Sequence, residues 1–318
     1  MAIITGAHSS YDEAGKGNRE DLSDVIADVS PTETPFLSML STNKATATKH
    51  EWTKDTLAAA AQNAQLEGGE AVGVDPAARV RIDNYCQILG KFPVVTGTQE
   101  IVNKAQVKSE MAYQMARRMK EMKRDLELIM IGQSNVKVAG SESTAREMGS
   151  FDAYLVTNNQ LAAGSSAPTG DGTDVSDYAG TDRALTETIW EAGLQSLFTN
   201  SGGDSNVKAI VTAATKGVIS TFTSSATRYV TTDDKQLTAS IDVYDGDFHT
   251  VTIIPDRWCK TGLAYIVDPE YVKLSNLRNI HSFNLAKTGD SIRKQIVWET
   301  TLETCNEKAH VLFGDLNT

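Results

Sequence analysis

Residues 101–131 read IVNKAQVKSEMAYQMARRMKEMKRDLELIMI, and this stretch governs how the rest of the chain is interpreted. Its large apolar side chains recur at steps of three or four, apart from the last adjacent pair: Met111, Met115, Met119, Met122, Leu126, Ile129 and Met130. That spacing puts them on one face of an α-helix. No proline interrupts the run, and Gly132 can end it. The helix would be about 45 Å long. It is either the core helix of a large α+β domain or a strut in a flat, extended subunit.

The other faces of this predicted helix are charged. Arg117–Glu121 and Lys123–Glu127 are opposite charges four residues apart, and we expect both to form ion pairs worth a few tenths of a kcal/mol. Residues 101–127 hold seven Lys or Arg against four Asp or Glu, in a chain of net charge −11. This local excess could face phosphate groups. A solvated face or a contact with an acidic neighbour is the favoured explanation.

Composition limits the classes of protein to consider. A chain of 318 residues can bury a sizeable core and form two or three subdomains. Its acidic balance argues against a chain that binds nucleic acid or anionic membranes as a whole. No stretch approaches the ~18 apolar residues of a membrane span, and the amino terminus lacks a signal-peptide pattern. Three widely spaced cysteines without a CxxC motif favour free thiols in a reducing compartment. These features predict a soluble, intracellular protein.

The first hundred residues divide into an arm and an excursion. Residues 1–17 are typical of an extended arm, and residues 18–29 predict a short helix. A second helix can start at Ser30 in a capping box or at Thr34-Pro35, and an apolar plug follows it. Residues 46–53 and 79–96 predict strands, separated by an Ala-, Gln- and Gly-rich stretch. A lone two-stranded ribbon is marginal in water, so this excursion needs a surface in its own chain or in a neighbour's.

The rest of the chain predicts alternating helices and strands. Residues 158–180 resemble a linker at a subdomain boundary, and a helix follows from Thr181 or Asp182. A strand over 208–213, a helix over 217–222, a hairpin of strands 239–244 and 250–254, and a strand over 263–267 come next. Ser291–Thr304 is the longest predicted strand. Its alternation predicts one buried face and one solvated face, with Glu299 and Glu303 on the solvated side.

No constellation predicts catalysis, a cofactor or a metal. Gly68 and Gly73 have the spacing of a phosphate loop, but Val74 and Asp75 stand where Lys and Ser or Thr are required. Cys259 could pair with a histidine such as His249, although no nucleophile elbow surrounds it. Residues 171–177 carry evenly spaced aspartates without the closing glutamate of a calcium loop. We therefore predict no catalytic, cofactor-binding or metal-ligating residues.

Taken together and in order, several segments resemble one known family. They are residues 18–26 (NREDLSDVI), 30–36 (SPTETPF), 112–118 (AYQMARR), 123–127 (KRDLE), 253–257 (IIPDR), 264–271 (AYIVDPEY), 285–291 (LAKTGDS) and 306–310 (NEKAH). The series is similar to the major capsid proteins of tailed bacteriophages, nearly from end to end. No single segment is decisive, but their order and spacing are specific.

The resemblance implies an α+β fold of the Hong Kong ninety-seven capsid type. Its parts would be an N-terminal arm (1–44), an extended two-stranded loop (45–98), a peripheral domain with a long spine helix (99–180 and 256–318) and an axial domain (181–255). Some members of this family cross-link the loop to a neighbour through a Lys–Asn isopeptide bond. Lys54 is a loop lysine, but no family motif marks it, so no cross-link is predicted.

The implied function is structural. The chain would be a major capsid protein that self-assembles into hexamers and pentamers and forms an icosahedral shell around double-stranded DNA. It would bind DNA without sequence specificity, use separate scaffolding, portal and decoration proteins, assemble in the host cytoplasm and reside in the virion. The loop tip would carry the intersubunit contacts: Leu66, Gly68, Gly69, Glu70 and Val72. Two alternatives are a non-viral, encapsulin-like compartment shell and an intracellular hydrolase using Cys259 or an aspartate pair.

Overall fold

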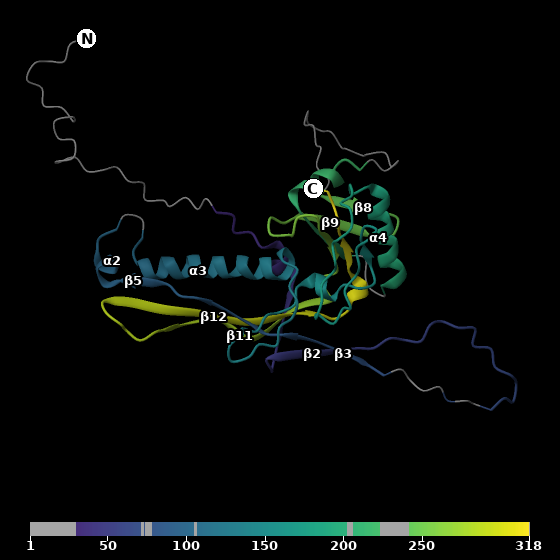
Figure 1. The fold of residues 1–318 in the computed structure, drawn as a ribbon, viewed down its shortest axis with the longest axis horizontal. Helices are drawn as coiled ribbons and strands as arrows, with labels where there is room; N and C mark the ends of the chain where they lie inside the picture. The colour runs from purple at the N-terminus through teal and green to yellow at the C-terminus, as the bar shows by residue number, and fades with distance from the viewer. Residues whose placement is uncertain are drawn as a thin grey trace, which may run out of the picture.

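The computed structural model describes residues 30–70, 73, 78–104, 107–201, 206–222 and 242–317. The arm at 1–17, the helix expected over 18–29 and strand residues 239–241 lie outside this part of the chain. The described chain is elongated, with a long helix and two long strands side by side and a second sheet at one end (Figure 1). It is a mixture of helices and largely antiparallel strands, as the predicted α+β class requires.

The first sheet has five strands and lies along the long helix. Its order is β1 (Ser41–Lys44), β11 (Val272–Asn284), β12 (Ser291–Thr304) and β4 (Gln87–Lys91), and β5 (Val94–Thr96) also pairs with β12. β12 is antiparallel to β11, β4 and β5, whereas β1 is parallel to β11. Leu89, Ile296 and Trp298 join the core cluster that includes Met122 and Leu126 of the helix. The helix and the two long strands therefore share one core.

The second sheet has six strands and its own core. Its order is β6 (Asn159–Gln160), β13 (Val311–Phe313), β10 (Ala264–Val267), β7 (Asn206–Val211), β9 (Thr250–Pro255) and β8 (Val243–Asp245). The helices α4 (Glu187–Asn200) and α5 (Ala213–Ile219) pack against it and share its core (Figure 1). Trp190 stacks on Phe313 with ring centroids 5.1 Å apart. A Cβ at Gly193 would lie 2.5 Å from the Phe313 ring, so this approach of helix to sheet requires glycine.

The long helix starts later than the sequence predicts. Helix α2 (Gly97–Ile101) is separate, and α3 runs over Glu110–Glu127 and continues as a π-helical turn over Leu128–Gly132. The expected continuous helix over 101–131 is therefore wrong in its first third. The reason is capping. The Ser109 hydroxyl accepts from the amide of Ala112, and the Glu100 carboxylate accepts from the amides of Glu110 and Met111 at 3.0 and 3.2 Å.

The apolar face of α3 is confirmed as a core face. Met111, Met122, Leu126 and Met130 are all at most 5% exposed. The ion pair Arg117–Glu121 forms at 3.6 Å. The predicted pair Lys123–Glu127 does not form, because Glu127 is fully buried and accepts hydrogen bonds from the backbone of another helix.

The strand β12 matches its predicted bounds but not its predicted solvated face. Residues 296–304 are buried on both faces. Glu299 accepts from Arg146 and from Arg278, the latter at 2.7 Å, and Glu303 accepts from His50 and Ser275. The charged residues that the alternation assigned to solvent are therefore internal ion-pair and hydrogen-bond partners.

Smaller differences concern where the other helices begin and one strand that was missed. Helix α1 is Pro35–Met39, so the start at Thr34-Pro35 is confirmed and the start at Ser30 is wrong. Helix α4 begins at Glu187 after its cap Thr186, not at residue 181 or 182. The helix predicted over 217–222 is α5, which begins at Ala213 after its cap Thr212. The long strand β11 was not predicted at all.

The stretch at 158–180 is folded rather than a bare linker. It contains β6 and a backbone bridge between Ser166 and Asp177. Two short 3-10 helices, Phe151–Tyr154 and Glu307–Ala309, lie outside this stretch in the sequence. The second helix contacts the segment just before it, because the Glu307 carboxylate accepts hydrogen bonds from the backbone amides of Val156 and Thr157.

Candidate intersubunit surface

The two-stranded excursion projects from the body of the molecule. Strands β2 (Lys49–Lys54) and β3 (Val80–Tyr85) pair in antiparallel register, from Lys49 opposite Tyr85 to Lys54 opposite Val80. The described residues between them extend beyond the sheets and helices (Figure 1). All described residues from Asp55 to Glu70 are exposed. Leu57 is 100% exposed and Leu66 is 88% exposed, so neither apolar side chain is covered by the described part of its own chain.

Four of the five predicted contact residues lie at this tip. Leu66, Gly68, Gly69 and Glu70 are exposed, and Val72 lies outside the described residues. The Gly69 amide donates to the Leu66 carbonyl at 3.0 Å, which closes a tight turn. Gly68 has φ = 77°, a conformation that favours glycine. The turn therefore presents Leu66 and Glu70 outward; their contact with a neighbouring subunit stays a prediction.

The base of the ribbon, unlike its tip, is fixed by a buried asparagine. Asn84 is fully buried. Its side-chain nitrogen donates to the carbonyls of Leu302 and Gly149, at 3.0 and 3.3 Å, and its oxygen accepts from the amides of Gly149 and Tyr85, at 2.9 Å each. One side chain thus joins the ribbon to β12 and to the loop that precedes the first 3-10 helix.

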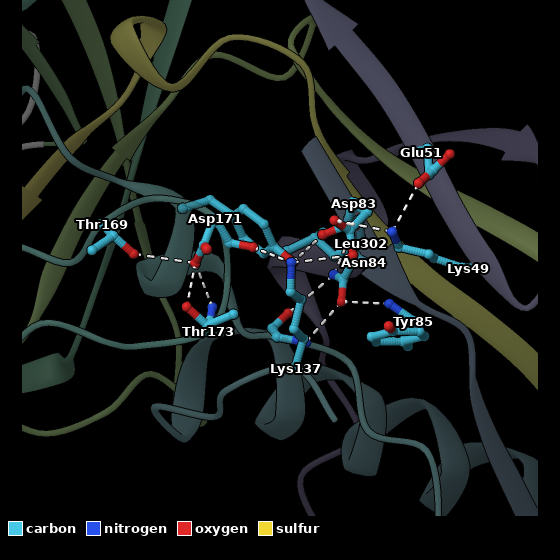
Figure 2. A network of polar contacts seen from close by, with 12 residues as sticks. Lys49, Glu51, Asp83, Asn84, Tyr85, Lys137, Thr169, Asp171, Thr173 and Leu302 are labelled. Carbon is cyan, nitrogen blue, oxygen red and sulfur yellow. Dashed lines mark hydrogen bonds and ion pairs between the residues drawn. The ribbon is translucent and has the colours of Figure 1, made fainter. Parts of the chain in front are cut away.

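A network of ion pairs next to Asn84 also connects the ribbon to the rest of the subunit (Figure 2). The Lys49 ammonium lies 2.8 Å from Glu51 and 3.6 Å from Asp83, and the Lys137 ammonium lies 3.1 Å from Asp83. Lys137 also donates to the carbonyl of Asp171 at 2.5 Å. Hydrogen bonds from Thr173 and Thr169 lower the pKa of the Asp171 carboxyl. The ribbon's direction is therefore held by the subunit's own body.

A second anchor joins the ribbon to the first sheet. His50 Nε2 lies 2.9 Å from the Glu303 carboxylate, which also accepts from Ser275 at 2.7 Å and from Asn43 at 3.2 Å. Burial acts to raise the pKa of Glu303, but these hydrogen bonds outweigh it and lower the pKa to about 2. Sequence reasoning missed Glu303, Asn84 and Lys137 because each acts on a residue more than fifty positions away.

The geometry at Cys259 does not suit a nucleophile. Its side chain is 6% exposed, and burial followed by the nearby Asp256 raises its pKa, so the thiolate is disfavoured. Its thiol points to the carbonyls of Lys260 and Leu263. In the described part of the chain, no three His, Cys, Asp or Glu side chains are arranged to hold a metal. No helix among the described residues is long and apolar enough to cross a membrane.

Comparison with solved structures defines the class of fold. The chain is similar to a subunit of the cyanophage A-1(L) capsid, with a TM-score of 0.67 and 12% identity, covering 95% of this chain and 98% of that one. It is also similar to the capsid of a native GTA particle, with a TM-score of 0.62 and 12% identity, covering 99% and 100% of the two chains. A chain from Gordonia phage Cozz gives a TM-score of 0.59 at 12% identity, covering 99% and 97%. The fold is therefore the Hong Kong ninety-seven type of phage capsid fold.

Sequence comparison then gives the family. Residues 4–317 match the SU10 major capsid protein family, and the chain belongs to it. The major capsid protein of Escherichia phage Phieco32 is 30% identical over 174 residues, an alignment that spans 49% of each protein. The chain therefore aligns with about half the length of this curated relative. The family is one of structural capsid proteins, as the resemblance in the sequence predicts, and its place is the phage capsid.

Proposed function

We propose that copies of this chain assemble into hexamers and pentamers that close into an icosahedral shell around double-stranded DNA. The observation that carries this proposal is the exposed loop between β2 and β3. A fully exposed Leu57 and a nearly fully exposed Leu66 would each gain free energy if another surface covered them. In a chain of the capsid family, another copy of the same chain is the natural cover.

The same chain offers apolar surface for such a contact. The first sheet and the α2 region expose several large apolar side chains, each more than 40% exposed: Ile88, Phe92, Val94, Ile101, Val102 and Phe283. We propose that Leu66, Gly68, Gly69, Glu70 and Val72 contact this surface on a neighbouring subunit. Each copy would then carry one loop tip and one apolar sheet surface. The loop tip of one subunit would bind the sheet surface of the next, and identical subunits would join head to tail around a ring.

The four-part division of the chain remains part of the proposal. The arm would be 1–44, the extended loop 45–98, the peripheral domain 99–180 with 256–318, and the axial domain 181–255. The five-stranded sheet with α3 supports a peripheral domain, and the second core supports an axial one. Strands β4 and β5 pair with β12, and β6, β10 and β13 pair within the second sheet, so these short strands would tie the parts together.

We further propose the partners that such a shell needs. The packaged DNA would be bound without sequence specificity, and separate scaffolding, portal and decoration proteins would complete the particle, with assembly in the host cytoplasm. A compartment shell that encloses an enzyme is the competing function within this fold. The family assignment supports the genome shell instead. The contents of shells isolated from infected cells, DNA or protein, distinguish the two.

Assembly is tested directly with the purified chain. Light scattering at micromolar concentration should show capsomers or shells, and electron microscopy should show their symmetry. Leu66→Asp should abolish assembly while circular dichroism stays unchanged, because this side chain is 88% exposed in the single subunit. Gln65→Asp, an exposed polar neighbour, is the matched control and should assemble. A strict 34.4 kDa monomer under all salt and crowding conditions would contradict the proposal.

A further inference from the structure

The root of the amino-terminal arm is held by a carboxylate from the long helix. Both oxygens of Glu127 accept backbone hydrogen bonds from α1, one from the Phe36 amide and one from the Leu37 amide, each at 2.7 Å. Glu127 is fully buried, and so is Phe36. The two amides belong to the first turn of α1, whose amides have no partner within the helix. A single side chain therefore fixes the start of this helix.

A second buried carboxyl contacts the first. Asp256 is 3% exposed and lies close enough to Glu127 to raise its pKa, and its Oδ2 is buried without a hydrogen-bond donor among the described residues. A hydrogen bond between two carboxyl groups requires that one of them carries a proton. Among the described residues, no basic side chain lies within ion-pair distance of either group. A proton between Asp256 Oδ2 and the Glu127 carboxyl would take the place of a cation in this buried pair.

Asp256 also holds the other side of the arm root. Its Oδ1 accepts from the Trp258 amide at 2.9 Å, and the Trp258 indole donates to the Glu33 carbonyl at 3.0 Å. The Arg124 guanidinium lies 5.5 Å from the Trp258 ring centroid and donates to the Pro31 carbonyl at 3.3 Å. Residues 31–37 are therefore held by α3 on one side and by the Asp256–Trp258 segment on the other. The two carboxyl groups lie where these elements meet.

The charged groups around the pair do not favour a second negative charge. Helix α1 (PFLSM) has no titratable side chain, and Arg124, on the same helix as Glu127, is directed at Pro31 and Trp258. The Cys259 thiol lies near both carboxyls and near Asp152 of the first 3-10 helix, and burial followed by these acidic groups raises its pKa. Burial and then the nearby Asp256 raise the pKa of Glu127 to about 8, and they outweigh the amide hydrogen bonds from Leu37 and Phe36, which act to lower it. Burial raises the pKa of Asp256 and outweighs the amide hydrogen bond from Trp258.

We propose that the Glu127–Asp256 pair is a proton-controlled clasp: with one shared proton it holds residues 31–37 on the long helix, and ionisation of both carboxyls releases them. The sign follows from the raised pKa of Glu127. Below pH 4.5, the ordinary pKa of Glu127, the group is protonated in the folded and the unfolded chain, and the pair costs no free energy. Between pH 4.5 and about 8 the folded chain keeps a proton that the unfolded chain loses, so the free energy of unfolding falls as pH rises. Above about pH 8 two negative charges lie side by side in a buried site. The clasp is a property of the single subunit and does not depend on shell assembly.

Hydrogen exchange of the peptide that spans residues 34–40 tests the clasp in the full chain. Protection is compared at pH 6.5 and pH 9 after correction for the intrinsic exchange rate, with the buried strand β10 as an internal reference. The wild-type peptide should lose at least tenfold in protection at pH 9 relative to β10. Glu127→Gln keeps an acceptor oxygen and cannot ionise, so its protection should change less than twofold between the two pH values. Glu121→Gln, one helix face away, should behave as wild type.

A second variant separates a lost contact from a lost proton. Asp256→Asn leaves Glu127 intact as the acceptor of both amides and removes the second charge, so protection should persist at pH 9. If Glu127→Gln is unprotected at both pH values, the Asp256→Asn result decides. Equal wild-type protection at the two pH values, or a tenfold alkaline loss that persists in Asp256→Asn, would overturn the proposal.

Discussion

The carboxyl-terminal half of β12 and the loop between β2 and β3 are opposite extremes of one chain. Residues 296–304 are buried on both faces although they include Glu299 and Glu303. The described residues from Asp55 to Glu70 are exposed although they include Leu57 and Leu66. Polar residues are buried where partners from distant segments satisfy them, and apolar residues stay in water where the subunit provides none. The difference teaches that residue type alone does not determine burial in a subunit built for assembly.

The largest effect is expected where the core of α3 is charged. Met122 is 1% exposed, and Met122→Asp would place an unpaired carboxylate between the helix and the first sheet. The cost is several kcal/mol, comparable with much of the stability of a domain, so we expect insoluble or unfolded protein. Ala116→Asp lies on the exposed side of the same helix and should stay soluble. Expression and thermal melts measure both; equal melting temperatures would mean that this face is not buried.

The next effect is an acid-dependent loss of stability from a buried neutral histidine. Burial lowers the pKa of His310 from 6.5 to about 3, and its Nδ1 accepts from the Asp268 amide at 3.2 Å. Stability from this site is present above pH 6.5 and is lost as pH falls from 6.5 to about 3, by about 5 kcal/mol in total.

His310→Gln should flatten that part of the pH dependence, whatever its effect on stability at pH 7. The exposed His281, changed to Gln, is the control and should leave the slope unaltered. Urea unfolding at a series of pH values provides the measurement. An unchanged slope in His310→Gln would show that other groups control acid unfolding.

A smaller effect separates an arginine that pairs with a buried carboxylate from one that pairs with an exposed carboxylate. Arg146 pairs with Glu299, whose side chain is 4% exposed, whereas Arg79 pairs with Asp55, which is 62% exposed. Arg146→Met should cost about 2 kcal/mol, since Arg278 still neutralises part of the buried charge. Arg79→Met should change stability by less than about 0.5 kcal/mol. Denaturant midpoints of the two variants test the contrast, which fails if the two losses are equal.

The smallest effect on the subunit is expected at the loop. Replacing residues 58–77 by a short Gly/Ser turn should leave the unfolding free energy within about 1 kcal/mol, because loop length changes closure entropy only modestly. The same protein should fail to assemble. A circular-dichroism melt and electron microscopy of the assembly reaction are the two measurements. Normal shells would exclude the intersubunit role, and loss of the folded subunit would place this stretch in the core.

The sequence by itself determined the elements whose signal is local. The three- and four-residue spacing of Met111 to Met130 gave the face of α3 that packs on the core, and the β-rich composition of Ser291–Thr304 gave the bounds of β12. The order of short motifs along the chain was enough to indicate the capsid fold. These signals need only residue type and spacing, because hydrogen bonding in a helix or strand repeats with a fixed period.

Only the tertiary structure decided the roles of the charged residues. Glu127 is four positions from Lys123, yet it caps α1, ninety positions away, because helix and arm meet there. Glu299 and Glu303 follow the alternation of a solvated face, yet Arg146 and His50 arrive from other segments and cover them. Asn84 fixes the ribbon through contacts with Gly149 and Leu302. The partner of a buried charge is set by which segments the fold brings together, and no spacing along the chain encodes that distance.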